Sequence, residues 1–452
     1  MSASIFKAYD IRGLVDGEIT PDFTFSVGAA FAHFLKGERE PGTVVIGEDM
    51  RPSSPELADA FSAGVTSQGF DVIRIGLAST DMLYFAAGKL NLPGAMFTAS
   101  HNPAAYNGIK MCLSGARPIG KESGLLLIEK YATEGTPIPL SQVGVERKQE
   151  MLEDYVSHLL ELVNLSQTRP LKIVIDAGNG MAGHTAPAVF KRLNAEVIEM
   201  YFELDGTFPN HEANPIDPEN LRDLQAAVIK HKADIGLAFD GDADRCFLVD
   251  EKGDLVNPSA LTALIATREL AKHPGSTIIY NLISSKAVKE VVEEHGGTAV
   301  RSRVGHSYIK KLMAETGAVF GGEHSGHFYF RDFWRADSGM LAALHAIAAL
   351  GEGDVSLSTL LAPFNRYVSS GEINSTVSDA VAASKEIENQ YGAMEGVTLD
   401  HLDGLTVTGD TWWFNLRPSN TEPLLRLNAE GSTVAEMERT RDNVLRMIAD
   451  FS

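Results

Sequence analysis

Three aspartates spaced two residues apart are the side chains of this sequence best suited to hold a metal ion. Asp240, Asp242 and Asp244 lie in DGDADR, between the apolar segments IGLAF and CFLVD, which predict two strands. Carboxylate oxygens are the ligands that Mg²⁺ prefers, at about 2.1 Å. Side chains on one face of an extended strand are about 6–7 Å apart, so the segment must curl to bring three oxygens to one ion. The small residues Gly241 and Ala243 permit such a curl.

Two other kinds of site share parts of this pattern. A calcium loop of the EF-hand type would use Glu251 at its twelfth position, but it needs Gly at the sixth, where this chain has Arg245. Its flanks would also be helices, so we reject it. An apolar strand followed by D-x-D is also typical of phosphatases that form an aspartyl phosphate, with Asp240 as the nucleophile. The segment alone leaves this alternative open.

A serine and a histidine stand side by side in FTASHNPAAYNGIK, after the apolar segment PGAMF. Ser100 and His101 could form a nucleophile and its base, but such a pair needs hydrogen-bond contact oriented by a third group, and adjacent side chains usually diverge. Lys110, ten residues after the serine, offers a point charge for a phosphate. The segment is therefore a candidate phosphate site in which the Ser-His adjacency carries little weight.

Two further polar loops follow predicted strands. GGEHSGH carries donors and acceptors beside glycines, which suits a sugar. RPSNTEP carries an arginine that can bind a phosphate with two parallel hydrogen bonds, together with hydroxyl and amide groups. The candidate binding residues are Glu323, Ser325 and His327 in the first loop, and Arg417, Ser419, Asn420 and Thr421 in the second.

Two other segments are weaker candidates. AYDIRG near the N-terminus offers Tyr9 and Arg12 at the end of a short strand pattern. DAGNG, residues 176–180, resembles a dinucleotide-binding turn but lacks the full G-x-G-x-x-G pattern, so we do not expect a dinucleotide there.

Composition excludes several classes of protein. The formal net charge of −21 argues against nucleic-acid binding, which relies on Lys and Arg at phosphates. Any phosphate site must then be a local island of positive charge. Only Cys112 and Cys246 are present, so a disulfide framework is not expected and a reducing cytoplasm fits. We expect no signal peptide, no membrane partner and no membrane span, because no apolar run reaches about 18 residues.

The elements that must position these loops alternate between strand and helix. The segments TVVIG, DVIRIG and PGAMF predict strands between helices, which indicates a largely parallel sheet with helices on its faces, and the pattern repeats from LKIVIDAGNG and again after Asn257. Thr20 and Pro21 suit the N-cap and first turn of a helix. The last ~90 residues differ, since LTVTGDTWWFNLR predicts a hairpin around Gly409. We expect α/β domains over 1–145, 146–252 and 253–362, and an α+β domain over 363–452.

Taken together, TASHNP, GDADR, GEHSGH and RPSNTEP, in this order and at these spacings, resemble the α-D-phosphohexomutase family, whose members include bacterial phosphomannomutases and phosphoglucomutases. The resemblance covers essentially the whole chain. It implies an α/β fold of three successive mixed α/β sandwich domains plus a smaller C-terminal α+β domain, around a central cleft.

The resemblance also implies roles for individual residues. Ser100 would be carried as phosphoserine, and Asp240, Asp242 and Asp244 would bind Mg²⁺ together with that phosphate. Glu323, Ser325 and His327 would contact the sugar. The non-reacting phosphate would be held by Arg417, Ser419, Asn420 and Thr421, the basic residues near the reacting phosphate would be Arg12, Lys110 and Arg245, and further cleft residues would be Tyr9, His101 and His306.

The implied activity is reversible phosphoryl transfer between the 6- and 1-positions of a hexose phosphate, through a 1,6-bisphosphate. Mannose phosphate is the expected substrate, with glucose phosphate also accepted. Asn420 departs from the Gly found at that place in many phosphoglucosamine mutases, which disfavours that alternative. A metal-dependent sugar phosphatase using Asp240 is the other alternative, and a non-catalytic binder of metal or sugar phosphate is a third.

Overall fold

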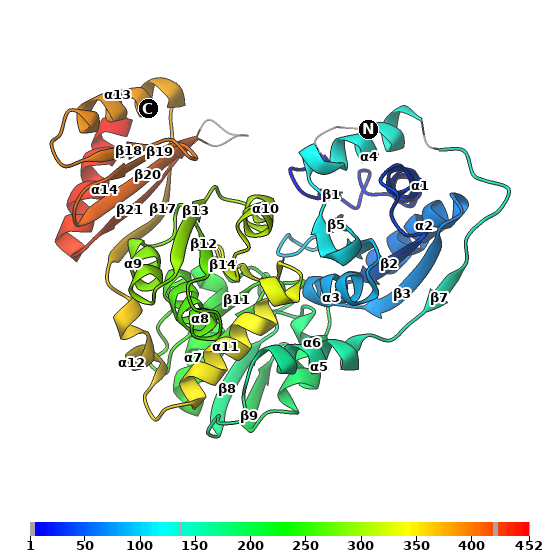
Figure 1. Cartoon of the computed structure of the whole chain (residues 1–452), viewed down its shortest axis with the longest axis horizontal. Helices are drawn as coiled ribbons and strands as arrows, with labels where there is room; N and C mark the ends of the chain where they lie inside the picture. Colours follow the sequence, from blue (N-terminus) through cyan, green and yellow to red (C-terminus); the bar gives the residue numbers. More distant parts are fainter. Residues whose placement is uncertain (1–4, 136, 419–423, 452) are drawn as a thin grey trace. The chain divides into compact units, whose positions relative to one another are not determined.

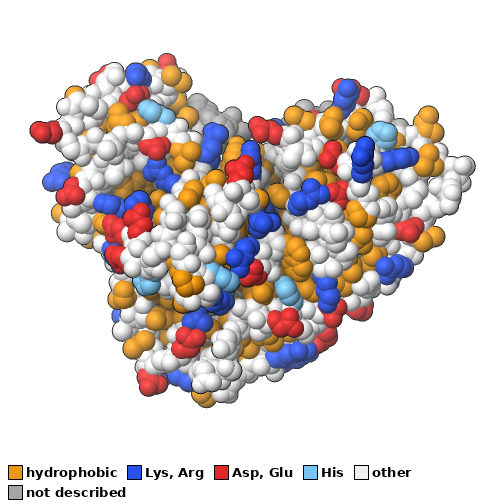
Figure 2. All heavy atoms as spheres, in the orientation of Figure 1, with side chains coloured by type: hydrophobic (Ala, Val, Ile, Leu, Met, Phe, Trp, Pro, Cys, Tyr) orange, Lys and Arg blue, Asp and Glu red, His pale blue; other side chains and the backbone are white. Residues whose placement is uncertain are grey.

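The computed structural model describes residues 5–135, 137–418 and 424–451, which form two compact units. The first unit contains residues 1–256 and 325–360, and the second contains residues 257–324 and 361–452. The chain passes between them three times, the third time within α12 (Leu357–Leu361). Figure 2 shows acidic and basic side chains interspersed over the visible face.

The first sheet of the first unit carries the Ser100 loop (Figure 1). Its strand order is β1-β5-β4-β2-β3-β7, with β6 paired to β5. Strands β2, β3, β4 and β7 are parallel, as the alternating pattern predicts, whereas β5 returns antiparallel to β4. The strands are β1 (Ile11–Leu14), β2 (Thr43–Glu48), β3 (Asp71–Leu77), β4 (Gly94–Phe97), β5 (Tyr106–Leu113), β6 (Arg117–Pro118) and β7 (Glu146–Lys148). The helices are α1 (Pro21–Gly37), α2 (Ser54–Ser67), α3 (Thr80–Leu90) and α4 (Leu125–Glu134).

The predicted start of α1 is confirmed. The Thr20 side chain accepts a hydrogen bond from Phe23 N at 3.2 Å, and Pro21 occupies the first turn, where its missing N–H costs nothing. The buried face of α1 packs with α2, α4 and the sheet in one apolar core that includes Phe31, Phe61 and Phe97. That core fixes β4, and therefore the point at which the Ser100 loop begins.

The second sheet of the first unit carries the aspartate loop. Its order is β11-β10-β8-β9, in which β8, β9 and β10 are parallel and β11 forms an antiparallel hairpin with β10. The hairpin loop is the segment from Asp240 to Arg245. The strands are β8 (Leu171–Asp176), β9 (Ala195–Met200), β10 (Ile235–Phe239) and β11 (Cys246–Val249), and this unit also contains the short pair β15 (Phe328–Phe330) and β16 (Ala336–Asp337). The helices are α5 (Leu152–Leu162), α6 (Ala182–Phe190), α7 (Arg222–His231) and α11 (Gly339–Gly351).

The second unit holds a parallel sheet and an antiparallel sheet. The parallel strands lie in the order β13-β12-β14, and the C-terminal strands in the order β17-β21-β20-β19-β18. The predicted hairpin is confirmed as β19 and β20. The strands are β12 (Thr277–Asn281), β13 (Thr298–Ser302), β14 (Phe320–Gly322), β17 (Val368–Thr376), β18 (Thr398–Asp400), β19 (Leu405–Thr408), β20 (Trp412–Pro418) and β21 (Leu424–Gly431). The helices are α8 (Pro258–Lys272), α9 (Lys286–Glu294), α10 (His306–Thr316), α13 (Ala380–Gly392) and α14 (Val434–Ala449).

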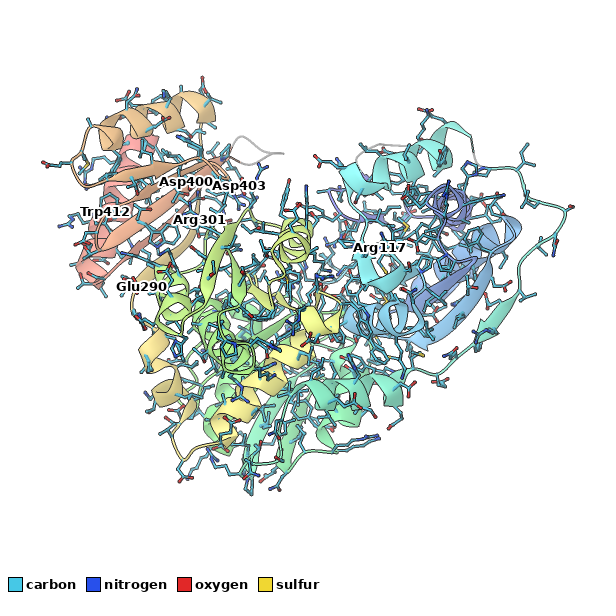
Figure 3. The ribbon with its side chains drawn as sticks, viewed as in Figure 1. Arg117, Glu290, Arg301, Asp400, Asp403 and Trp412 are labelled. Carbon is cyan, nitrogen blue, oxygen red and sulfur yellow. The ribbon has the colours of Figure 1, made fainter. Side chains whose placement is uncertain are left out.

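An ion pair and a hydrogen bond join the C-terminal sheet to the rest of the second unit. Arg301 of β13 pairs with Asp400 of β18 (Figure 3), and Lys286 N donates to Glu430 Oε2 of β21 at 3.0 Å. Polar contacts of this kind hold the antiparallel sheet against the parallel one. The fold thus consists of three α/β domains followed by a C-terminal α+β domain, as the sequence predicts. The residue ranges given above for the four domains stay a prediction.

Candidate active site

Ser100 meets the aspartate loop within the first unit. Its Oγ donates a hydrogen bond to Asp240 Oδ2 at 2.8 Å, across 140 residues of sequence. Ser100 is 4% exposed and has φ of 50°, a left-handed conformation that side chains rarely adopt. Its own N–H donates to Thr98 Oγ1 at 2.9 Å, which supports the turn. The loop therefore presents the hydroxyl to the carboxylate from a constrained backbone.

His101 also contacts the serine. Its Nδ1 lies 3.3 Å from Ser100 Oγ, so the expectation that the two adjacent side chains diverge is wrong. The left-handed turn at Ser100 brings the two groups to the same side. Burial lowers the pKa of His101 well below its usual range, and the charges of Arg245 and Arg12 lower it further. The imidazole is therefore neutral and adds no charge to the site.

The three aspartates curl into one cluster. One carboxylate oxygen from each of Asp240, Asp242 and Asp244 lies within 4.8 Å of the others, and all three residues are buried. Ala243 has φ of 58°, so the predicted curl is achieved by a left-handed turn at one of the two small residues. Asp242 Oδ1 and Asp244 Oδ1 accept no hydrogen bond from any described residue.

Two cations offset part of this buried negative charge. Lys110 Nζ lies 2.7 Å from Asp242 Oδ2 and 2.6 Å from Asp244 Oδ2, and Arg245 Nε donates to Asp240 Oδ2 at 2.8 Å. Burial raises the pKa of Asp240. Burial acts in the same direction on Asp242, but the adjacent Lys110 ammonium outweighs it and holds the pKa of Asp242 below its ordinary value. The three carboxylates and two basic groups interact strongly, because burial removes the water that would screen their charges.

A divalent cation fits this cluster. Three carboxylates against two basic groups leave a net negative site, and two buried oxygens lack hydrogen-bond partners among the described residues. Buried charges without partners are costly, and a hard cation with oxygen ligands would satisfy both oxygens. The ligands would be Asp240, Asp242 and Asp244.

His327 extends the cluster away from the serine. Its Nδ1 lies 3.0 Å from Asp337 Oδ2 and 3.8 Å from Asp244 Oδ1. Burial would lower its pKa, but the two carboxylates outweigh burial and raise it. Within the first unit, His327 therefore lies beside the aspartate loop.

Arg12 braces the Ser100 loop. Its Nη1 donates to Asn102 Oδ1 at 2.6 Å, and its Nη2 pairs with Asp10 Oδ2 at 2.5 Å. Its side chain is 19% exposed, so it can also reach a ligand. Tyr9 is half-buried in the turn that precedes β1.

The remaining predicted residues are distributed over both units. Ser325, half-buried, opens the second segment of the first unit. In the second unit, the buried Glu323 accepts a hydrogen bond from Gly305 N at 3.1 Å. Arg417 Nη1 lies 3.6 Å from Asp403 Oδ2, and its Nη2 lies 3.7 Å from Glu372 Oε2, with 16% of its side chain exposed. Ser419, Asn420, Thr421 and the side chain of His306 lie outside the described residues.

Comparison with known proteins identifies the family. Four models of phosphoglucomutase/phosphomannomutase domains match in succession: α/β/α domain I over residues 3–137, domain II over 153–253, domain III over 257–367 and the C-terminal domain over 372–447. The chain belongs to the phosphoglucomutase/phosphomannomutase family.

Individual members of this family match over the whole chain. A phosphomannomutase of Escherichia coli (strain K12) is 41% identical over 449 residues, which is 97% of each chain. A protein of Xanthomonas campestris named "Phosphohexose mutases" is 40% identical over 452 residues, covering 99% of this chain and 100% of its own. The crystal structure of a phosphoglucomutase/phosphomannomutase family protein from Burkholderia thailandensis superposes with a TM-score of 0.91 at 33% identity, over 100% of this chain and 98% of that one. The protein is thus an isomerase that transfers phosphoryl groups on hexose phosphates, in a metal-dependent family.

Two residues of this phosphohexomutase site were missed by sequence reasoning. Thr80 donates to Asp242 Oδ2 at 2.6 Å through Oγ1 and to Asp242 O at 2.9 Å through its N–H, so the start of α3 holds the aspartate loop. Asp337 pairs with His327. The run Ser79-Thr80-Asp81 is typical of a helix N-cap, which predicts the helix but not its contact with Asp242.

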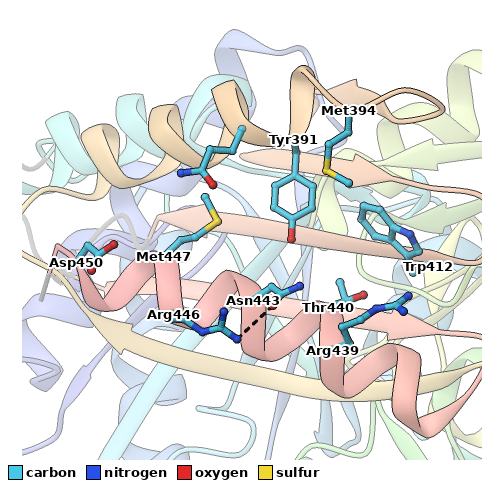
Figure 4. A pocket seen from close by; sticks show the side chains of 10 residues that line it. Tyr391, Met394, Trp412, Arg439, Thr440, Asn443, Arg446, Met447 and Asp450 are labelled. Carbon is cyan, nitrogen blue, oxygen red and sulfur yellow. Dashed lines mark hydrogen bonds between the residues drawn. The ribbon is translucent and has the colours of Figure 1, made fainter.

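A cavity in the C-terminal domain of this family member is not the site. It has a volume of about 570 Å³ and lies between α13 and α14, beside Tyr391, Trp412 and Thr440 (Figure 4). None of the predicted site residues that the structure describes lines it. In open α/β sheets, ligands bind at loops beyond the carboxyl ends of strands, where Ser100 and Asp240 lie. No helix among the described residues is both long and apolar enough to cross a membrane.

Proposed function

We propose that this protein interconverts hexose 6-phosphate and hexose 1-phosphate through a phosphoserine at Ser100, with mannose phosphate preferred and glucose phosphate accepted. The observation that carries the proposal is the 2.8 Å contact between Ser100 Oγ and Asp240 Oδ2, inside a buried cluster that also contains Lys110 and Arg245. Phosphoryl transfer needs positioning and charge neutralisation more than covalent chemistry, and this cluster supplies both.

The proposed reaction consists of two exchanges at Ser100. The Oγ–P bond of the phosphoserine breaks while a P–O bond forms to the free hydroxyl of the substrate, which gives a 1,6-bisphosphate. After the bisphosphate turns over in the site, its other phosphoryl group returns to Ser100 Oγ by the same exchange. Lys110 and Arg245 keep positive charge beside the transferring group, since their pKa values are raised by the neighbouring aspartates against the lowering effect of burial.

Mg²⁺ is the ion we expect at Asp240, Asp242 and Asp244, where it would neutralise charge that develops on the transferring phosphoryl group. A phosphoserine brings about −1.5 to −2 charges to a site that already holds three carboxylates. The two buried oxygens that lack partners, Asp242 Oδ1 and Asp244 Oδ1, support this assignment.

The substrate contacts are assigned by the matching loops. We propose that Glu323, Ser325 and His327 contact sugar hydroxyls, and that Tyr9, His101 and His306 line the cleft. Arg12 would face the reacting phosphate. The non-reacting phosphate would be held by Arg417, Ser419, Asn420 and Thr421. We also assign the protein to the cytoplasm, which fits its two buried cysteines, Cys112 and Cys246, since neither forms a disulfide.

A phosphatase that uses Asp240 as its nucleophile is the main alternative. Asp240 is fully buried, and both of its oxygens already accept hydrogen bonds, Oδ2 from Ser100 and Arg245 Nε and Oδ1 from Arg245 N. A carboxylate enclosed in this way is poorly placed to attack phosphorus. The Ser100 hydroxyl, which donates to this carboxylate, is the better carrier of the phosphoryl group.

The deciding experiment maps the phosphate. Wild-type protein incubated with glucose 1,6-bisphosphate should gain one phosphate by intact mass, located on Ser100 by peptide mapping and stable to hydroxylamine. Ser100→Ala should gain none and should lose at least about 10³-fold in kcat, whereas Ser157→Ala, at a half-buried position of α5, should behave as wild type. A hydroxylamine-labile phosphate on Asp240 would establish the alternative, and neither phosphate nor turnover would indicate a binding protein.

The sugar is settled by steady-state kinetics. Mannose 1-phosphate, glucose 1-phosphate and glucosamine 1-phosphate should be compared under identical conditions. We expect kcat/KM to be highest for mannose, lower for glucose and lowest for glucosamine. A strong preference for glucose would overturn the mannose assignment.

A further inference from the structure

Arg51 is a fully buried arginine whose hydrogen bonds go to a single loop. It follows β2 and is 1% exposed. Its Nη1 donates to Pro103 O and Tyr106 O, both at 2.9 Å, and its Nη2 donates to Ser100 O at 3.0 Å and Asn102 O at 2.7 Å. Four backbone carbonyls between residues 100 and 106 thus converge on one guanidinium.

Only an arginine can make this set of contacts. The guanidinium carries five N–H donors in a planar fork, whereas the lysine ammonium is a point charge with three donors. The remaining donor, Arg51 Nε, lies 3.2 Å from Asp49 Oδ2. Asp49 is itself held in place, because its Oδ1 accepts from Arg51 N at 3.0 Å and from Ser54 Oγ at 2.6 Å. The arginine is therefore oriented at the start of α2 and directed at the loop.

We infer that Arg51 is a positioning residue for phosphoryl transfer, which it serves by holding the Ser100 loop in the conformation that presents Ser100 Oγ to Asp240. This inference rests on the proposed role of Ser100 as phosphoserine. Arg51 does not touch the reacting atoms. It acts through the carbonyl oxygen of Ser100, which is two bonds from the Cα that carries the reacting side chain.

Secondary structure does not fix this loop. The stretch between β4 and β5 contains no helix or strand, and Ser100 sits at φ of 50°, which costs conformational free energy unless its surroundings hold it. Ser100 is buried, so without Arg51 its carbonyl would lose a hydrogen bond in a place that water does not reach easily. The Arg51 side chain thus binds four carbonyls of the loop and helps to fix the loop's conformation.

The aspartate side of the unit contacts the same group. The Phe208 ring centroid lies 5.0 Å from the guanidinium carbon of Arg51, in cation–π geometry. At Gly206 a Cβ would come within 2.6 Å of Arg51 Cα, so a larger residue there would press on the arginine. Arg51 therefore contacts the segment that follows β9, as well as residues of its own domain. The arginine links the position of the serine loop to that of the domain carrying Asp240.

The test compares Arg51, which follows β2, with Arg74, a buried arginine of the neighbouring strand β3. Arg74 is 7% exposed and pairs with Glu48 and Asp59, away from the Ser100 loop. Arg51→Lys and Arg74→Lys each keep the charge and lose the fork. Both should lower the urea midpoint, so stability alone does not separate positioning from packing. Three further readouts do: kcat and KM for glucose 1-phosphate, the rate at which glucose 1,6-bisphosphate phosphorylates Ser100, and amide hydrogen exchange of residues 99–107.

We expect Arg51→Lys to lower kcat and the phosphorylation rate by about 10²-fold, the loss associated with a misplacement of about 1 Å, with KM changed less than about threefold. Exchange of residues 99–107 should rise in this variant only. Arg74→Lys should keep wild-type kcat. Wild-type kcat in Arg51→Lys, or an equal loss in Arg74→Lys, would overturn the inference.

A second variant covers the case in which Arg51→Lys does not fold. Phe208→Leu leaves every hydrogen bond of Arg51 in place and removes only the ring over it. We expect a several-fold fall in the phosphorylation rate together with faster exchange of residues 99–107, and an unchanged rate would overturn the inference. If wild-type protein carried no phosphate on Ser100, the proposed function would fail separately. The exchange comparison between the Arg51 and Arg74 variants would still report whether Arg51 holds the loop.

Discussion

Replacing Gly241 with alanine should separate the serine from the aspartates. The backbone of the aspartate loop runs against that of the Ser100 loop, and a Cβ at Gly241 would lie 2.4 Å from Ser100 O. The obstructing atom is backbone, so it cannot rotate away. Restoring ordinary contact at about 3.4 Å requires the two loops to move apart by about 1 Å.

The expected cost follows from that displacement. Overpacking a close contact destabilises a protein by about 1–3 kcal/mol, which a protein of this size tolerates. A misplacement of about 1 Å at a reacting centre costs about 10²-fold in rate. We therefore expect Gly241→Ala to fold, to lose about 2–12 °C in Tm at roughly 2–4 °C per kcal/mol, and to lose about 10²-fold in kcat.

The assay is steady-state turnover of mannose 1-phosphate and glucose 1-phosphate, with Tm measured on the same samples. Gly42→Ala is the matched control, since a Cβ at this exposed glycine before β2 would meet nothing within 4 Å. Wild-type kcat in Gly241→Ala would refute the reasoning, because it would mean that the contact between Ser100 O and Gly241 does not set the position of the serine.

Three other outcomes follow from the structure. EDTA should abolish turnover of the wild-type protein and Mg²⁺ should restore it. Asp242→Ala should lack turnover even with Mg²⁺, while its circular dichroism spectrum stays unchanged. Wild-type turnover that is insensitive to EDTA would contradict a metal at the aspartates. Burial lowers the pKa of His211, but its contact with Asp176 at 3.0 Å outweighs burial and raises it. The pair therefore stabilises the fold fully below about pH 6.5, and this contribution is lost as pH rises through the pKa of His211 in the folded protein. His211→Gln should reduce the fall of the urea midpoint with rising pH. An unchanged pH dependence in the variant would contradict this role of His211. Thr433→Ala removes the N-cap of α14, which accepts from Glu436 N at 3.2 Å, and should cost about 1 kcal/mol without changing kcat.

Much of the site was predictable because its chemistry is local in sequence. DGDADR between two apolar segments predicts a hairpin loop with three carboxylates, and β10 and β11 confirm the strands on either side. The requirement that the segment curl follows from ligand distances alone, and the left-handed Ala243 meets it. Thr20, Pro21 and the hairpin between β19 and β20 were predicted for the same reason, since caps and tight turns depend on a few neighbouring residues.

Other features depend on which strands lie side by side. The first sheet was expected to be largely parallel, but β5 turns back antiparallel to β4 because the two are joined by the short Ser100 loop rather than by a helix. That reversal brings Lys110 of β5 toward the aspartates, 132 residues from Asp242. The spacing of Ser100, Lys110 and Asp242 along the chain contains no information on this pairing.

The sequence by itself determined the chemical groups, their loops and the family, because each motif is a short run of residues whose types state what they can bind. Only the tertiary structure decided how those groups are held. Arg51, in a polar segment after a strand, would be expected at the surface, where most arginines lie, yet it is buried against four carbonyls. Thr80 begins a helix and also holds Asp242. Contacts of this kind arise only when distant loops meet at the ends of strands, since the packing of the sheets, not the spacing of the residues, brings them together.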